Sequence, residues 1–195
     1  MNEVSYYPEL ASSLEETIKA NLSSNDINVK ALYLPTYGNN IRDYLVYYVE
    51  HNKGNVSKSL EVFLKDVPKV RTDTIVLFDN PKTDKFTIVI VEVKLLNSAG
   101  LSEFSQLIGY NLVTKIEYGI LVNVGGRIST DLNSILISDA DVTKIERIIS
   151  TPPYKQMHKI GVMSYNPSTK NLDYIETLTG VSIPKLVQEI ENKLS

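Results

Sequence analysis

Cysteine and tryptophan are both absent from the chain. The lack of cysteine excludes disulfide bonds and thiolate zinc sites, although it does not fix the redox compartment. No apolar run approaches the roughly 20 residues that cross a bilayer as a helix. The first residues, MNEVSYYPEL, show neither the basic nor the apolar region of a signal peptide. We therefore expect a soluble, intracellular protein of the cytoplasm with no membrane partner.

An excess of basic residues is absent as well, because 20 Lys and Arg side chains stand against 23 Asp and Glu side chains. Without a global basic field, nucleic acid can be bound only through a local patch or through metal ions that invert the local charge. Lys69, Arg71 and Lys82 supply local positive charge near the middle of the chain, but acidic residues share this span. A phosphate-binding patch and an ordinary mixed surface both remain open.

The rest of the composition suits one globular domain. Of the 195 residues, 43% are hydrophobic and 22% are charged, and a chain of this length can bury a substantial core. The sequence contains no internal repeat and no low-complexity linker. We expect a single domain over residues 1–195, with a core at about 8–124 and a C-terminal αββα extension at about 139–195.

Hydrophobic periodicity predicts both helices and strands. Predicted helices cover residues 8–22, 40–52, 57–65, 101–115 and 140–150, and a last helix begins near Pro184. Predicted strands cover residues 29–34, 71–80, 86–94, 117–124, 159–165 and 172–177. This order predicts an α/β fold with a central mixed sheet flanked by helices.

Charged residues occur in the most apolar part of this sheet. Residues 71–94, RTDTIVLFDNPKTDKFTIVIVEVK, read as two apolar strands around a polar turn. Both faces of the second strand are apolar, which is typical of a central strand covered on both sides. Period-two alternation places Glu92 and Lys94 on one face at the end of that strand. An unpaired buried charge costs several kcal/mol, so these side chains need partners.

The turn length predicts one partner. A four-residue loop over 81–84 pairs Asn80 with Lys85, and the numbers of paired residues then sum to 165. In that register Asp73 lies directly opposite Glu92, with roughly 4.5–5.5 Å between the Cβ atoms. A slip of one residue would turn Asp73 to the other face. We therefore predict that the two carboxylates lie close enough to bind one cation.

Two carboxylates at this separation repel each other unless a proton, a lysine or a metal ion intervenes. Lys94 supplies one positive charge, and Mg²⁺ favours carboxylate oxygens while keeping several waters. A metal-bound water beside a lysine is a plausible nucleophile for a phosphodiester. An ordinary cross-strand ion pair is the alternative. A second Glu-x-Lys triplet, at residues 191–193, falls on a predicted helix without a partner aspartate.

The spacing also resembles a known motif. RTD at residues 71–73, an interval of 18 residues and then EVK at residues 92–94 resemble the PD-(D/E)xK nuclease superfamily, with an Arg-x-Asp form similar to its RecB-like branch. Gln106 and Tyr110 resemble the Gln-x-x-x-Tyr motif of that branch, while Thr72 stands where the motif has proline. The resemblance covers residues 69–124, and elsewhere only the order of elements agrees.

The resemblance implies a restriction-endonuclease-like core of αβββαβ order, as in Holliday-junction resolvases and small nucleases of archaea and their viruses. It implies that Asp73, Glu92 and the Val93 carbonyl bind Mg²⁺ or Mn²⁺, and that Lys94 positions the attacking water. It further implies DNA as the partner and a homodimeric assembly. Gln106 would steady the site or contact the DNA backbone, although a polar pair at the edge of the helix is equally possible.

Many members of this superfamily add a glutamate from the first helix. Glu9, Glu15 and Glu16 are the candidates here. On the helical wheel Glu15 flanks the apolar stripe, whereas the other two point away from it. We therefore favour Glu15, with a solvated helix carboxylate as the alternative.

These patterns predict a metal-dependent deoxyribonuclease with Asp73, Glu92, Lys94 and Gln106 at its site. One alternative is a catalytically silent DNA-binding protein on the same fold. Another is a protein-interaction module that neither binds nor cleaves DNA.

Overall fold

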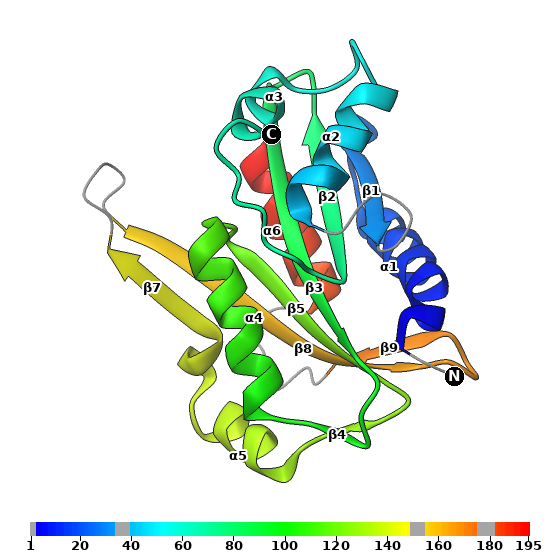
Figure 1. Cartoon of the computed structure of the whole chain (residues 1–195), viewed down its shortest axis with the longest axis vertical. Helices are drawn as coiled ribbons and strands as arrows, with labels where there is room; N and C mark the ends of the chain where they lie inside the picture. The colour runs from blue at the N-terminus through cyan, green and yellow to red at the C-terminus, as the bar shows by residue number, and fades with distance from the viewer. Residues whose placement is uncertain (1–2, 34–39, 149–154, 175–181) are drawn as a thin grey trace.

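The computed structural model describes residues 3–33, 40–148, 155–174 and 182–195, which form a mixed β-sheet flanked by helices (Figure 1). The helical elements are η1 (Glu3–Tyr6), α1 (Tyr7–Asn21), α2 (Ile41–His51), α3 (Lys58–Phe63), α4 (Leu101–Thr114), α5 (Thr130–Ser138), η2 (Ala140–Thr143) and α6 (Ile183–Leu194). The strands are β1 (Asn28–Tyr33), β2 (Thr74–Asn80), β3 (Lys85–Lys94), β4 (Ser98–Ala99), β5 (Tyr118–Val124), β6 (Arg127–Ile128), β7 (Lys144–Ile148), β8 (Lys155–Asn166) and β9 (Asn171–Tyr174). The predicted α/β class is confirmed.

The main sheet has seven strands: six follow the order β1-β2-β3-β5-β8-β7, and β9 pairs with residues 163–166 of β8, whereas β7 pairs with residues 155–159. Strand β2 runs antiparallel to both β1 and β3, whereas β3, β5 and β8 are mutually parallel. Strands β4 and β6 form a separate two-stranded sheet. Helices α2 and α3 stand between β1 and β2, and β4 precedes α4; apart from these three elements, the order α1, β1, β2, β3, α4, β5 agrees with the αβββαβ order that the resemblance implies.

Helices cover both faces of the central strands. Gly119 lies beside Ile90 in the β3–β5 register, and a Cβ atom on Gly119 would approach Leu107 of α4 to 3.1 Å. On the opposite face Tyr118, beside Val89, donates a hydrogen bond of 3.1 Å to Glu189 of α6. Helix α4 therefore covers the face that carries Ile90 and, by alternation, Glu92.

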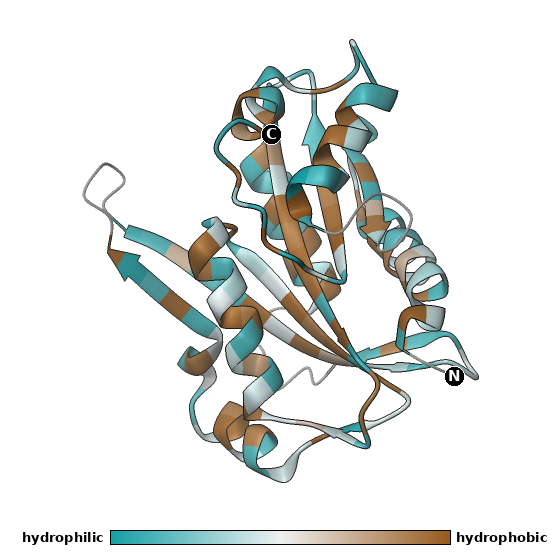
Figure 2. Ribbon diagram, in the orientation of Figure 1, coloured by the Kyte–Doolittle hydropathy of each residue, from teal (hydrophilic) through white to brown (hydrophobic). Residues whose placement is uncertain are grey.

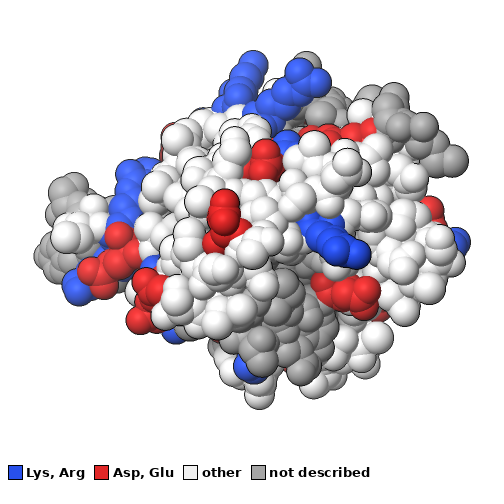
Figure 3. Space-filling view, turned by 90° about the horizontal axis from the view of Figure 1, so that it is seen from below, with Lys and Arg blue, Asp and Glu red and all other residues white. Residues whose placement is uncertain are grey.

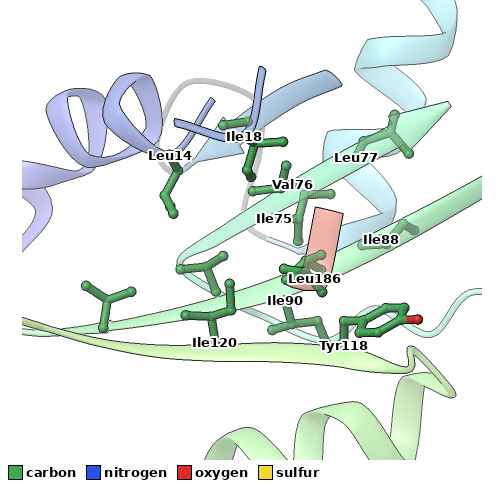
Figure 4. Packing of buried hydrophobic residues seen from close by; sticks show 14 of the residues in the cluster. Leu14, Ile18, Ile75, Val76, Leu77, Ile88, Ile90, Tyr118, Ile120 and Leu186 are labelled. Atoms are coloured by element: carbon green, nitrogen blue, oxygen red, sulfur yellow. The ribbon is translucent and has the colours of Figure 1, made fainter. Parts of the chain in front are cut away.

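This double cover explains the apolar composition of the central strands, because every residue of β2 and of β5 is buried. Figure 2 shows hydrophobic residues along these strands, and Figure 4 shows Leu14 and Ile18 of α1 and Leu186 of α6 within the same core. Within the described residues, no helix is long and apolar enough to cross a membrane.

The predicted register of the β2–β3 hairpin is confirmed. The ladder runs from Asn80 opposite Lys85 to Thr74 opposite Val91, so the numbers of paired residues sum to 165 throughout. Asp84 closes the four-residue loop with a φ of 55°, in the left-handed region.

The helix predicted over 140–150 is wrong. Residues 140–143 form the short helix η2, and residues 144–148 form the edge strand β7, in which exposed and half-buried residues alternate. Residues 144–148 form a strand and not a helix because they pair with β8. Their β-branched residues suit a half-buried strand. Residues 149 and 150 of the predicted helix belong to the segment 149–154, which lies outside the described residues. The structure also contains a helix that the sequence patterns did not predict, α5.

The C-terminal segment belongs to the same sheet as the predicted core. Strand β8 is longer than predicted and pairs with β5 over residues 159–165. Strand β9 ends at Tyr174, and residues 175–177 of the predicted strand lie outside the described residues. Helix α6 packs against α1 and β3, so the proposed extension completes the core.

Candidate functional site

Asp73 and Glu92 lie at the same end of the β2–β3 hairpin. Thr74 and Val91 form the last pair of the ladder, and the next position of the register sets Asp73 opposite Glu92. The Val93 N–H donates a hydrogen bond of 2.9 Å to Asp73 Oδ2, which holds the aspartate beside the end of β3. Glu92 is only 2% exposed, whereas Asp73 is half-buried.

The backbone before β2 is held from the other side by α2. The buried Tyr44 donates its hydroxyl proton toward the carbonyl oxygens of Thr72, at 3.1 Å, and Asp73, at 3.4 Å. The Ile41 N–H donates to the Val70 carbonyl at 3.0 Å. The first turn of α2 therefore fixes the position of Asp73.

Lys94 is the cation of this group. Its Nζ lies 2.6 Å from Glu92 Oε1, and its side chain is 19% exposed. The side chains of Glu92 and Lys94 lie on one face because they are two residues apart in a strand. The predicted proximity of a lysine to the strand-end carboxylate is therefore present.

The structure adds Glu3, a residue that the sequence patterns did not single out. Glu3 Oε2 accepts a hydrogen bond of 3.2 Å from the Leu95 N–H, directly after Lys94. Its Oε1 accepts a hydrogen bond of 2.9 Å from Tyr7. The sequence offered one signal, because Glu3 precedes the buried Tyr7 by one helical turn. The helix was expected only from Pro8, so Glu3 was not considered.

Glu15 lies elsewhere, against the edge strand β1. Its Oε2 accepts a hydrogen bond of 3.0 Å from the Ala31 N–H, and it forms ion pairs with Lys19 and Lys30. These contacts direct its carboxylate to the free edge of the sheet, so the structure does not bring it to Asp73. The other two candidates also have their own partners: Glu9 pairs with Lys170, and Glu16 accepts a hydrogen bond from Ser12.

Burial and mutual repulsion shift the titration of the group. Burial, and after it the negative charge of Asp73, raise the pKa of Glu92 to about 7, while Lys94 opposes the shift. Burial also raises the pKa of Asp73, although the hydrogen bonds from Val93 and Tyr7 act against it. Burial alone would lower the pKa of Lys94, but its bond to Glu92 and the charge of Asp73 raise it above its ordinary value.

Gln106 and Tyr110 lie on α4, the helix that covers the Glu92 face. Gln106 is exposed, and its Nε2 donates a hydrogen bond of 2.6 Å to the Tyr110 hydroxyl. Within the part of the chain that the structure describes, no hydrogen bond or ion pair joins this pair to Asp73, Glu92 or Lys94.

The three basic residues considered for DNA binding separate into two places. Lys69 and Arg71 are exposed in the segment that leads to Asp73. Lys82 lies in the loop at the other end of the hairpin and pairs with Asp26 at 2.7 Å. Seven strand residues at about 3.3 Å each separate that loop from Asp73, so Lys82 does not belong to this site.

The carboxylates fit a divalent cation by charge. Asp73, Glu92 and Glu3 oppose one lysine, so full ionisation leaves an excess negative charge that the protonation of Glu92 partly relieves. Among the described residues, no group of three or more His, Asp or Glu side chains is placed to hold a metal ion. The candidate ligands for an ion are the carboxylates of Asp73 and Glu92 and the Val93 carbonyl, and Mg²⁺ can be held by one or two carboxylates because it keeps several waters.

No family model matches the chain, and no curated protein matches it.

Proposed function

We propose that this protein is a metal-dependent DNA nuclease that hydrolyses phosphodiester bonds, and that it is a divergent member of the PD-(D/E)xK superfamily. The observation that carries the proposal is the buried carboxylate of Glu92 beside the half-buried carboxylate of Asp73, with Lys94 bonded to Glu92. The order of α1, β1, β2, β3, α4 and β5, with α2, α3 and β4 as additional elements among them, supports it.

Each residue has a role in this proposal. Asp73 and Glu92 would hold the ion, and the Val93 carbonyl would be a further ligand. A bound Mg²⁺ or Mn²⁺ would lower the pKa of water and neutralise charge on the phosphate. Lys94, which pairs with Glu92, would supply a positive charge and hydrogen-bond donors to an approaching phosphate or water. Glu3 ties the first helix to the backbone that follows Lys94.

DNA would be bound without a large basic surface. Figure 3 views the molecule from the end at which β4 and α5 lie, and acidic and basic side chains are interspersed on the described part of this face. The metal ion, Lys94 and the exposed Lys69 and Arg71 would therefore supply most of the attraction for phosphate. Gln106 and Tyr110 would contact the DNA backbone from α4, and a second copy of the chain would act on the other strand.

A cleavage assay tests the proposal. Purified protein is incubated with single-stranded, duplex and branched DNA in Mg²⁺, in Mn²⁺ and in EDTA. Cleavage should require the metal, and Asp73→Asn and Lys94→Ala should each lower its rate by at least about a hundredfold, within the usual range for a general acid–base residue. Lys155→Ala, at an exposed lysine paired with Glu146, is the matched control and should cleave like the wild type.

Unchanged cleavage in Asp73→Asn and Lys94→Ala would assign the activity to another site or to a contaminant. DNA binding with strong salt dependence and no cleavage in either metal would favour the catalytically silent DNA-binding protein.

A further inference from the structure

A gap in the sheet lies at the far end of β3 from Asp73 and Glu92. Strand β3 pairs with β2 from Lys85 to Val91, but with β5 only from Val89 onward. Among the residues that the structure describes, residues 85–88 therefore have no neighbouring strand on the β5 side. An unpaired strand edge inside a sheet leaves peptide groups without partners.

Buried polar contacts keep this gap open. Ile116 is the residue that would extend the β5 ladder toward Phe86. Instead its N–H donates to Thr114 Oγ1 at 3.3 Å, and its carbonyl accepts a hydrogen bond of 2.9 Å from Asn111 Nδ2. The same carbonyl lies 2.8 Å from Nδ1 of the buried His158. Both backbone groups of Ile116 therefore bond to side chains and do not pair with β3.

The register identifies the peptide groups that face the gap. The Val93 N–H points toward the β2 side, where it meets Asp73, so the odd-numbered residues of β3 face β2 and the even-numbered ones face β5. The Lys159 N–H donates to the Glu117 carbonyl, so the peptide groups of Glu117 face β8. Those of the next residue, Tyr118, therefore face β3, and its N–H donates to the carbonyl of Ile88. Three groups of β3 then face the gap without a partner from β5: the N–H and C=O of Phe86 and the N–H of Ile88. Within the described residues, no hydrogen bond to these three groups is present.

A cavity of about 170 Å³ lies against this edge, lined by Phe86, Thr87 and Ile88 of β3. The rings of Phe63 and Phe86, 5.2 Å apart between centroids, form an aromatic wall on one face of the sheet. Thr87 points to the opposite face by alternation. The volume is below the roughly 300–1,000 Å³ of pockets for drug-sized ligands, which suits a single ring system.

The rim of the cavity carries net positive charge. Lys115, Lys193 and Glu117 line it, and Lys193 pairs with Glu117. Lys115 is exposed, and within the described residues it has no ion pair. The cavity therefore combines an aromatic wall, a row of peptide donors and an acceptor, and one cation available for an anion.

We propose that this gap binds a nucleotide whose base has an amino group beside an unprotonated ring nitrogen, as adenine and cytosine do. The amino group donates to the Phe86 carbonyl, and the ring nitrogen accepts from the Ile88 N–H. The base continues the plane of the sheet and packs against Phe63, while Lys115 contacts the phosphate. Hypoxanthine and uracil instead carry a carbonyl beside an N–H. Their carbonyl would face the Phe86 carbonyl and their N–H would face the Ile88 N–H, so neither hydrogen bond could form. Binding here does not depend on the proposed nuclease activity.

Isothermal titration and amide-resolved NMR of the intact protein in EDTA test this inference, so that metal at the carboxylates plays no part. AMP and CMP should bind with dissociation constants of about 1 mM or below and shift the amide signals of Phe86 and Ile88. IMP and UMP should bind at least about tenfold more weakly, because buried donors and acceptors would be left mismatched. Adenosine should bind more weakly than AMP, and inorganic phosphate should not shift these amides.

Lys115→Ala should weaken AMP binding but not adenosine binding, whereas Lys19→Ala, at an exposed lysine of α1, is the matched control and should change neither. A 5′-phosphorylated oligo-dA that shifts the same amides at lower concentration than AMP would assign the nucleotide to a strand end, and the reverse order would assign it to a free nucleotide. Equal affinities for AMP and IMP, shifts confined to other residues, or AMP binding unaffected by Lys115→Ala would overturn the proposal.

Discussion

At the scale of single residues, the unusual feature is a buried glutamate with a pKa of about 7 at the end of a central strand. Burial is the largest cause and the charge of Asp73 adds to it, so the shift depends on two side chains at one strand end. The same shift would prepare the pair for a cation, because a cation replaces the proton that relieves their repulsion.

Asp73→Asn should lower the pKa of Glu92 below 7, because the substitution removes the negative charge that opposes ionisation. Asparagine keeps an oxygen that can accept from the Val93 N–H, so the backbone arrangement should survive. Carboxyl ¹³C NMR titration measures the pKa. Glu15→Gln removes a carboxylate elsewhere and should leave it unchanged, and an unshifted pKa in Asp73→Asn would mean that the two carboxylates do not interact.

Stability of the metal-free protein should fall as the pH rises from about 5 to about 8. Folding raises the pKa of Glu92 from 4.5 to about 7, so the folded protein holds this proton more tightly than the unfolded chain does. The resulting stabilisation is complete below 4.5 and is lost as the pH rises through 7. Urea unfolding in EDTA measures it, and Glu92→Gln should flatten the slope.

Added Mn²⁺ should restore more stability at about pH 8 than at about pH 5, because only ionised carboxylates bind the ion well. Thermal unfolding with and without Mn²⁺ gives this comparison. Equal stabilisation at both pH values, or in Glu92→Gln, would place the bound ion away from Glu92.

At the scale of elements, two glycines occupy opposite environments. Gly109 lies in α4, and a Cβ atom there would meet no atom within 4 Å. Gly126 follows the turn after β5, and a Cβ atom there would lie 1.8 Å from the Leu96 carbonyl oxygen and 2.5 Å from Asn123 Nδ2. Asn123 also bonds to Leu96 and Arg127, so this close approach joins the loops that follow β3 and β5.

Gly109→Ala should raise the free energy of unfolding by about 0.5–1 kcal/mol, since alanine is favoured over glycine inside a helix. Gly126→Ala should lower it by about 1–3 kcal/mol, because the backbone near Leu96 must shift. Denaturant unfolding of the two variants side by side measures both effects. A Gly126→Ala protein as stable as Gly109→Ala would contradict the close approach at this turn.

At the scale of the whole molecule, the C-terminal segment is integral to the sheet. Strand β8 pairs with β5 on one side and with β7 and β9 on the other, and α6 packs on α1. The residues expected to form an extension therefore share their hydrogen bonds with the predicted core.

Native-state hydrogen exchange should show amides of Ile160–Met163 in β8 opening at about the same free energy as those of Gly119–Val122 in β5, because both strands are buried within one ladder. Amides of β7, at the edge of the sheet, should open at a lower free energy. Exchange of β8 at the level of β7 would instead make the C-terminal segment a separate folding unit.

The sequence by itself determined the α/β class, the β2–β3 register and the approach of Asp73 to Glu92. Alternation and turn length are local properties, so a hairpin can be derived from its own residues. Tertiary contacts decided the rest. Glu3 bonds to Leu95, which is 92 positions away in the chain. Residues 144–148 form the strand β7 because they pair with β8. The Glu15 carboxylate bonds to the backbone of β1 instead of joining Asp73. No local pattern encodes such pairings, because their stability arises only when distant segments pack together.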